Sequence, residues 1–205
     1  MRRLAKFIIA SVVTVVLIAT FYFFFPSVWG ELLYPLDYQD AIKKYSEERG
    51  LRPNFVAAVI YTESRFNPKS VSSVGAVGLM QIMPGTADSI AEEMGEKTGD
   101  LTDPNTSIKY GTWYLKGLSD KYSGNTDLIC AAYNAGVGRA DKFKDGEMGL
   151  PAETNFFIEK VKNTETMYDK VYGSWYSQSQ SEKKNPVSIG FSNLGDFVKQ
   201  LILGR

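Results

Sequence analysis

The distribution of apolar residues predicts a largely helical chain. From residue 37 onward these residues recur at intervals of three and four positions, as in amphipathic helices, and alternating strand-like patterns are almost absent. Pro53 suits the first turn of one such helix, and Asp103 followed by Pro104 predicts the start of another. A longer helix is expected after Pro151. These patterns together predict an all-α domain over residues 37–176.

The apolar run at the N-terminus is of a different kind. Residues 7–25 contain no charged side chain, and as a helix they would extend roughly 28 Å, about the hydrocarbon thickness of a bilayer. Basic residues at positions 2, 3 and 6 precede the run, so the positive-inside rule leaves residues 1–6 in the cytoplasm. A cleaved signal peptide is the alternative, but its apolar region is usually about 7–15 residues and ends in small side chains. The pattern therefore predicts one transmembrane helix, which anchors the domain on the extracytoplasmic side of the cytoplasmic membrane.

Two further segments flank the predicted domain. Residues 26–36 are expected to form a short extended linker between the anchor and the domain. Residues 177–205 form a C-terminal tail that begins with a polar stretch. Within this tail, residues 191–203 carry apolar side chains at roughly helical spacing, which predicts a short amphipathic helix.

Composition removes several classes of function. Lys plus Arg and Asp plus Glu each number 23, so the net charge is zero, whereas a nucleic-acid-binding protein would carry a basic excess. The chain has no histidine and a single cysteine, Cys130. These counts exclude Ser-His-Asp and Cys-His nucleophilic systems, an internal disulfide, and histidine-based or multi-cysteine metal sites. We expect no metal and no cofactor, and we expect Cys130 to be a small buried apolar residue.

An acid–base reaction at a carboxyl group is the simplest chemistry that remains. Glu63 follows the apolar residues 55–60, one helical turn after Val59, which puts it on the buried side of that helix. A glycine-containing loop with Met80 and Met83 comes next, and a carboxyl beside apolar side chains keeps its proton near neutral pH. The general acid of a glycosidase has to be protonated in this way. From this residue alone, the alternative is a structural glutamate that caps a helix or pairs with an arginine.

Four blocks, taken in order, resemble the soluble-lytic-transglycosylase-like family over roughly residues 38–172. They are Glu63-Ser64, residues 78–87 (Gly-Leu-Met-Gln-Ile-Met-Pro-Gly-Thr-Ala), residues 131–136 (Ala-Ala-Tyr-Asn-Ala-Gly) and residues 151–154 (Pro-Ala-Glu-Thr). The resemblance implies a lysozyme-like helical domain that binds peptidoglycan glycan strands. It further implies that the domain cleaves the β-1,4 bond between N-acetylmuramic acid and N-acetylglucosamine without water, leaving 1,6-anhydromuramoyl ends.

The resemblance also implies a role for each matching residue. Glu63 would be the single catalytic acid and base, and Tyr133 the phenol that hydrogen-bonds its carboxyl. Substrate-binding positions would be Ser72 at the N-acetyl region, Gln81 and Met83 in the groove with Met83 near the acid, Asn134, and Glu153. Asn134 is also expected to order the loop that ends at Gly136, and Glu153 equally suits a charge in the first turn of a helix.

The chain departs from the family pattern at two positions and leaves two other functions open. Many members carry Arg and Tyr where this chain has Asn155 and Phe157, so a tyrosine contact to substrate is not expected there. One alternative is a hydrolytic lysozyme of the goose type, which would need an additional acid to position water, with candidates at Asp88, Asp100 and Asp103. The other is an inactive, membrane-tethered scaffold that binds the cell wall; the intact Glu63, Gln81 and Tyr133 argue against it.

Overall fold

The computed structural model describes residues 2–28, 30–173 and 175 of the 205-residue chain. Within these residues every named element is a helix, and the only strand-like pairings are two isolated β-bridges, Val71 with Val77 and Val77 with Ile82. The all-α prediction is therefore confirmed. The helix predicted over residues 191–203 lies outside the described residues.

The chain divides into two compact units. One comprises Met1–Pro35 with Lys170–Arg205, and the other is Leu36–Asp169. The second unit corresponds to most of the domain predicted over residues 37–176 but ends several residues earlier.

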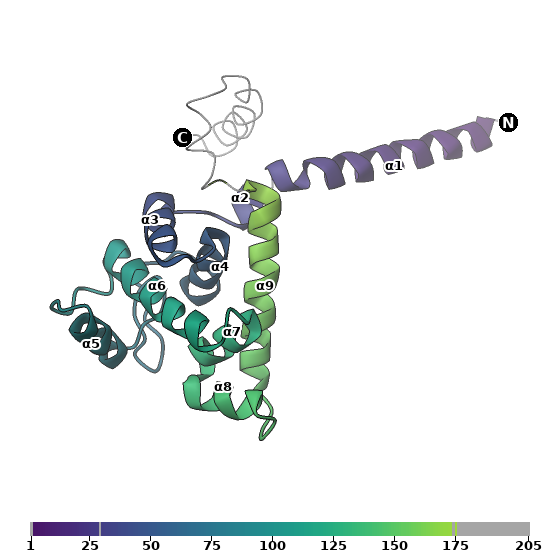
Figure 1. The fold of residues 1–205 in the computed structure, drawn as a ribbon. Helices are drawn as coiled ribbons and strands as arrows, with labels where there is room; N and C mark the ends of the chain where they lie inside the picture. Colours follow the sequence, from purple (N-terminus) through teal and green to yellow (C-terminus); the bar gives the residue numbers. More distant parts are fainter. Residues whose placement is uncertain (1, 29, 174, 176–205) are drawn as a thin grey trace. The chain divides into compact units, whose positions relative to one another are not determined.

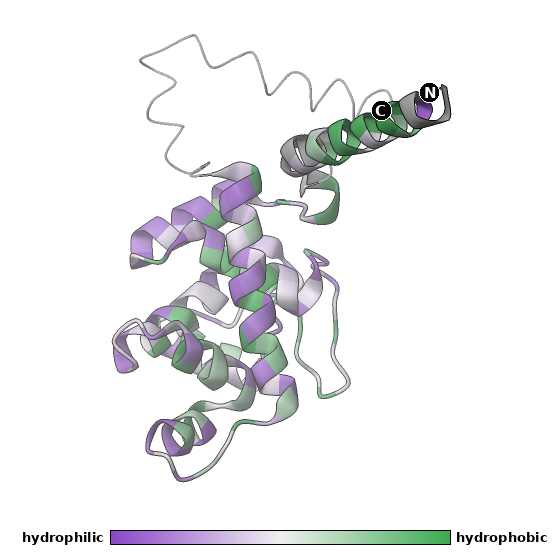
Figure 2. Ribbon diagram, turned by 90° about the vertical axis from the view of Figure 1, so that its right-hand side faces the viewer, coloured by the Kyte–Doolittle hydropathy of each residue, from purple (hydrophilic) through white to green (hydrophobic). Residues whose placement is uncertain are grey.

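The first unit contains α1 (Arg2–Val28), α2 (Gly30–Leu33) and the last residues of α9 (Ala152–Tyr172). Apolar residues follow one another along α1, as the colouring in Figure 2 shows, and the described side chains of residues 6–22 are exposed. In the part of the chain that the structure describes, no helix combines the length and the apolar character needed to cross a membrane.

The extended linker predicted over residues 26–36 is wrong for most of its length. Helix α1 continues to Val28, and α2 occupies Gly30–Leu33. Tertiary packing explains the difference: a Cβ atom at Gly30 would lie 2.4 Å from the Val171 side chain, so only glycine permits this close approach. The Tyr172 hydroxyl also donates a hydrogen bond to the Tyr34 carbonyl at 2.7 Å. Both contacts favour a helical segment at residues 30–33 over an extended linker.

The second unit is a bundle arranged around α6, which crosses its middle in Figure 1. Helix α6 contacts α3, α5 and α7, while α4 contacts α3, and α8 contacts α7. The helices that complete this unit, together with the larger part of α9, are α3 (Gln39–Arg49), α4 (Pro53–Ser64), α5 (Pro84–Glu93), α6 (Pro104–Lys121), α7 (Thr126–Ala135) and α8 (Val137–Lys144). Pro53 and Pro104 begin their helices as predicted, and the Asp103 carboxylate caps α6 by accepting from the Thr106 amide at 2.8 Å.

Helix α4 carries the central part of the core. Every residue from Pro53 to Ile60 is buried, which is the pattern of a helix enclosed on all sides rather than on one face. Arg52, immediately before α4, forms a two-point ion pair with Glu165 of α9 at 2.7 and 3.1 Å. Tyr61 packs edge-on against Tyr168 of α9, with ring centroids 6.3 Å apart. These contacts fix α9 alongside α4, so α9 can reach the end of α4 where Glu63 lies.

Candidate active site

Glu63 occupies the last turn of α4, at the point where the buried helix reaches the surface. Its side chain is half-buried, and burial raises the pKa of Glu63 from 4.5 to about 7, while the positive charge of Lys160 lowers it. The raised pKa that the sequence predicts for this carboxyl is thus confirmed, with desolvation as its main cause. A carboxyl with this pKa exchanges its proton near neutral pH, as an acid–base catalyst requires.

A tightly folded loop, residues 65–83, follows Glu63 and returns to α4. Arg65, Phe66 and Gln81 adopt left-handed backbone conformations, with φ of 51°, 62° and 47°. The Ser64 hydroxyl donates to the Leu79 carbonyl at 2.8 Å, which ties the far end of the loop to the residue beside Glu63. Glu63 and the Gly-Leu-Met-Gln block are therefore neighbours, although eighteen positions separate Glu63 from Gln81 in the sequence.

Helix α6 supports this block from the other side. The Met80 amide donates to the hydroxyl of Ser107, which is fully buried, at 3.2 Å. The Met80 side chain fills the space that Gly111 leaves, because a Cβ there would lie 2.2 Å from the Met80 sulfur. Gly78, with φ of 84°, passes so close to the Leu101 carbonyl that a Cβ would come within 2.0 Å of that oxygen. These contacts hold the backbone of the block rigidly against the start of α6.

Tyr133 lies on α7 and reaches the same block. Its hydroxyl donates a hydrogen bond to the Met80 carbonyl at 2.7 Å, and its ring packs at a tilt against Tyr114, with centroids 5.6 Å apart. Burial raises the pKa of Tyr133 well above its ordinary value, and the nearby charges of Glu63 and Tyr114 raise it further. The phenol therefore lies within electrostatic reach of Glu63. The one proton of the phenol is donated to the Met80 carbonyl, so a hydrogen bond between Tyr133 and Glu63 would need the phenol oxygen as the acceptor; that bond stays a prediction.

Gln81 and Ser72 have structural hydrogen bonds in the loop. The Gln81 side-chain amide donates to the carbonyls of Ser70 and Gly78, at 3.1 and 2.9 Å. The Ser72 hydroxyl accepts from the Ala76 amide at 2.9 Å. Both side chains are half-buried, so each stabilises the loop and keeps part of its surface open to solvent.

The remaining predicted substrate positions lie at the surface. Met83, immediately before α5, has an exposure of 42%, and Glu153 in the first turn of α9 is exposed. Asn134, also exposed, accepts a hydrogen bond from the buried hydroxyl of Thr154 at 2.9 Å, which links the end of α7 to the start of α9. The prediction that Asn134 orders the segment ending at Gly136 stays a prediction, and this contact is compatible with it.

Lys160 and Tyr114 are neighbours of the site that the sequence analysis missed. The Lys160 ammonium, on α9, donates to the carbonyl of Thr62 at 3.2 Å. Tyr114, on α6, packs against Tyr133. Lys160 lies 98 positions beyond Thr62, and no local pattern in the sequence links either residue to Glu63.

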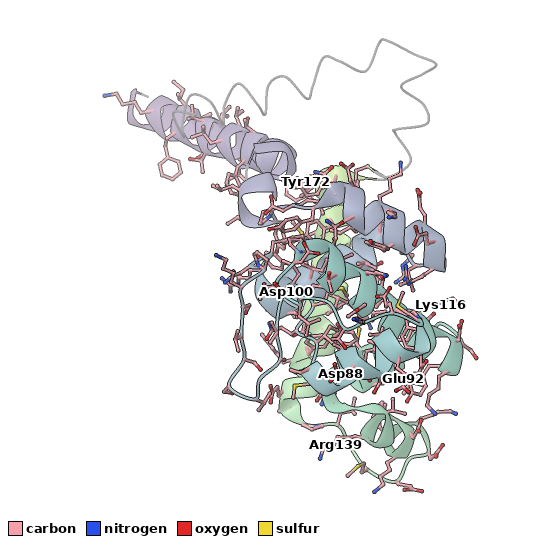
Figure 3. All side chains as sticks on the ribbon, turned by 90° about the vertical axis from the view of Figure 1, so that its left-hand side faces the viewer. Asp88, Glu92, Asp100, Lys116, Arg139 and Tyr172 are labelled. Carbon is pink, nitrogen blue, oxygen red and sulfur yellow. The ribbon has the colours of Figure 1, made fainter. Side chains whose placement is uncertain are left out.

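The three acids considered as partners for a hydrolytic reaction all have local hydrogen bonds. Asp88 accepts from the Thr98 hydroxyl at 2.6 Å, Asp100 accepts from Thr102, and Asp103 caps α6. Figure 3 shows Asp88 on α5 and Asp100 on the loop that leads to α6. Among the residues that the structure describes, none of these three acids has a resolved effect on the pKa of Glu63.

Cys130 is buried in α7, and burial raises the pKa of its thiol to about 12, so it is the inert apolar residue that the sequence predicts. Within the described part of the chain, no group of three or more His, Cys, Asp or Glu side chains is arranged to hold a metal ion.

Comparison with known proteins identifies the family. A family model described as the transglycosylase SLT domain matches residues 40–156, a range that contains Glu63, the Met80 block, Tyr133 and Glu153. The chain belongs to the transglycosylase SLT domain family. The resemblance drawn from the four sequence blocks is thereby confirmed.

Several relatives of this SLT domain are known. The soluble lytic murein transglycosylase of Escherichia coli (strain K12) is 34% identical over 163 residues, which cover 76% of this chain and 25% of the relative. The membrane-bound lytic murein transglycosylase C of Serratia proteamaculans (strain 568) is 35% identical over 113 residues, or 49% of this chain and 32% of the relative. The chain thus spans about a quarter of the length of its soluble relatives.

Solved structures agree with the SLT assignment. A complex of the 70-kDa soluble lytic transglycosylase with bulgecin A superposes with a TM-score of 0.65 at 32% sequence identity. The match covers 71% of this chain and 26% of that one. The helical domain described here therefore shares its fold with one part of a larger enzyme.

Proposed function

We propose that this SLT domain is a lytic transglycosylase that cleaves the β-1,4 bond between N-acetylmuramic acid and N-acetylglucosamine in peptidoglycan. The observation that carries the proposal is the half-buried Glu63, whose pKa of about 7 lets one carboxyl act first as an acid and then as a base. The names of the relatives, which are murein transglycosylases, support the choice of substrate.

One carboxyl is sufficient for this reaction. Protonated Glu63 donates its proton to the glycosidic oxygen as the bond from C1 of the muramoyl residue to that oxygen breaks. The resulting carboxylate takes the proton of the C6 hydroxyl of the same residue, and the C6 oxygen bonds to C1. Glu63 is protonated again at the end, no water is consumed, and the product is a 1,6-anhydromuramoyl end.

Among the described residues, no second carboxyl group has a resolved effect on the pKa of Glu63, and this favours the reaction over hydrolysis. Glycosidases that use two carboxyl groups hold them about 5–9.5 Å apart, and the second group activates water or attacks the sugar. Among the described residues, Lys160 is the one charged group with a resolved effect on the pKa of Glu63. A neighbouring carboxylate would raise this pKa as well and would be expected among its causes.

Other residues of the site would serve position and binding. Tyr133 would hold the Met80 backbone in place, and its phenol oxygen could still accept a hydrogen bond from the protonated acid. The side chains proposed to contact the glycan strand are exposed or half-buried: Ser72, Gln81, Met83, Asn134 and Glu153. No cofactor or metal is required.

The test is the product of digestion of purified peptidoglycan, analysed by mass spectrometry. We expect 1,6-anhydromuramoyl ends, each one water lighter than a reducing end, and near-complete loss of product for Glu63→Gln. Reducing ends as the main product would favour the goose-type lysozyme. A wild-type protein that binds peptidoglycan but releases nothing would favour the inactive scaffold.

We further propose that residues 7–25 anchor the domain in the cytoplasmic membrane, with residues 1–6 inside and the SLT domain outside. The uncharged sequence, the basic residues that precede it and the exposed apolar side chains of α1 support this location. Membrane-bound relatives of the family are known. Cell fractionation with N-terminal sequencing is the test: release into the medium of a protein that starts after residue 25 would contradict the anchor.

A further inference from the structure

The end of α4 has a cationic partner on a different helix. The last carbonyls of an α-helix lack intrahelical donors and need partners from beyond the helix. In α4 the Tyr61 carbonyl still accepts the regular bond from the amide of the C-cap residue Arg65 at 3.1 Å, and the Ser64 carbonyl accepts from the Asn67 amide in the following loop at 3.1 Å. The carbonyl of Thr62, one residue before Glu63, accepts from the Lys160 ammonium at 3.2 Å.

Lys160 is well placed for such a contact. It is half-buried, and the packing of α9 on α4 through Arg52 with Glu165 and Tyr61 with Tyr168 fixes the helix that carries it. A cation at the C-terminal end of a helix also interacts favourably with the helix dipole. The ammonium is therefore held in one place, beside the residue that carries the reacting carboxyl.

The groups around Glu63 come from four elements. Lys160 lies on α9, Arg65 ends α4, Tyr133 lies on α7, and Tyr114 lies behind it on α6. Burial and the Arg65 charge lower the pKa of Lys160, whereas the Glu63 charge raises it. Conversely, Lys160 opposes the effect of burial on the pKa of Glu63. Glu63 and Lys160 thus interact electrostatically at the C-terminal end of α4.

We propose that Lys160 is a positioning residue for Glu63: its ammonium holds the last turn of α4 and keeps a positive charge beside the Glu63 carboxyl. This positive charge favours the ionised form of the carboxyl. This charge matters because the same carboxyl has to lose its proton to the leaving oxygen and then act as a base. Burial alone would favour the neutral form and make the first transfer harder. The kinetic consequence rests on the proposed function, whereas the effect on the protonation equilibrium of Glu63 does not.

Three substitutions separate the charge from the hydrogen bond. Lys160→Met removes both, Lys160→Gln keeps a donor without the charge, and Lys160→Arg keeps the charge. Lys162→Met is the control, since Lys162 lies on the same helix but pairs at the surface with Asp127 at 2.9 Å. The full chain is used throughout, and thermal unfolding confirms that each variant is folded.

The primary measurement is the pH titration of the Glu63 carboxyl by carbon-13 NMR, with Glu63→Gln used to assign its signal. We expect a titration midpoint near 7 for the wild type and for the control Lys162→Met, and a midpoint close to that value for Lys160→Arg. In Lys160→Met and Lys160→Gln the midpoint should rise by about half a pH unit or more, because the positive charge is lost. The alkaline limb of the kcat/KM profile for release of anhydromuramoyl product should move in the same direction, because it follows the general acid in the free enzyme.

Unchanged midpoints in Lys160→Met and Lys160→Gln would overturn the proposal, as would a Lys160→Arg variant that titrates like Lys160→Met. If Lys160→Met does not fold, the difference between the midpoints of Lys160→Gln and Lys160→Arg decides whether the charge of Lys160 acts on Glu63. A wild type that makes no anhydromuramoyl product at any pH would refute the proposed function, while the NMR midpoints would still decide the role of Lys160.

Discussion

The hydroxyl of Tyr133 donates a hydrogen bond of 2.7 Å to the backbone carbonyl of Met80. Met80 is fully buried against α6 and precedes Gln81, and Tyr133 lies on α7 within the electrostatic influence of Glu63. This bond therefore joins the phenol on α7 to the loop after the acid, at the residue that packs against α6.

Replacement of Tyr133 by Phe should cost stability and activity together. The Met80 carbonyl would lose its donor in a buried environment, which costs about 1–3 kcal/mol of unfolding free energy. Turnover should fall roughly 10- to 100-fold, because a small shift of the loop displaces groups around Glu63. Urea unfolding and anhydromuramoyl product release are the two measurements.

Tyr110→Phe is the matched control. Tyr110 is buried, and its hydroxyl accepts from the Gly99 amide at 3.1 Å and donates to the Lys97 carbonyl at 3.4 Å, whereas Tyr110 has no resolved effect on the pKa of Glu63. We expect a similar loss of stability and an activity within about twofold of the wild type. Equal losses of activity in both variants would show that Tyr133 acts through general stability only.

Gly111→Ala tests the packing of the Met80 block against α6. The new methyl group would lie 2.2 Å from the Met80 sulfur and 2.8 Å from its Cβ, so the side chain and its backbone have to shift. We expect a loss of about 1–3 kcal/mol in unfolding free energy, together with reduced turnover.

Gly117→Ala, in the same helix, should behave in the opposite way. Nothing lies within 4 Å of its Cβ position and the residue is exposed, so alanine should stabilise α6 by up to about 1 kcal/mol. Its activity should match the wild type. If Gly111→Ala keeps full stability and activity, Met80 does not position the site.

Stability should depend on pH through Glu63. Its folded-state pKa of about 7 exceeds the ordinary 4.5, so the folded protein binds this proton more tightly than the unfolded chain does. The stabilising contribution is fully present below about pH 4.5 and is lost as pH rises through about 7, a change of about 3 kcal/mol.

Glu63→Gln removes this dependence. The difference in unfolding free energy between the variant and the wild type should therefore grow in favour of Gln as pH rises from 4.5 to 8. Urea unfolding at four pH values measures it, with Glu153→Gln as the control because Glu153 is exposed. Parallel profiles for the wild type and Glu63→Gln would contradict the raised pKa.

The sequence predicts those features that depend on interactions between residues close together along the chain. The uninterrupted apolar run from Phe55 to Ile60 predicts a buried helix, and Asp103 with Pro104 marks a helix start, because caps and helical periodicity involve residues within about four positions. Glu63 was identifiable by the same logic, as an acid one turn beyond Val59. The family blocks then added roles that no spacing alone implies.

Only the tertiary structure decided which groups meet around Glu63. The acceptor of the Tyr133 hydroxyl is the Met80 carbonyl rather than the acid, Ser107 and Gly111 receive Met80, and Lys160 reaches the Thr62 carbonyl. Each of these contacts joins residues 27 to 98 positions apart. Their formation depends on how helices pack, where a shift of about one ångström exchanges one hydrogen-bond acceptor for another. Local patterns in the sequence do not specify which hydrogen-bond acceptor lies within reach, whereas the packing of the helices does.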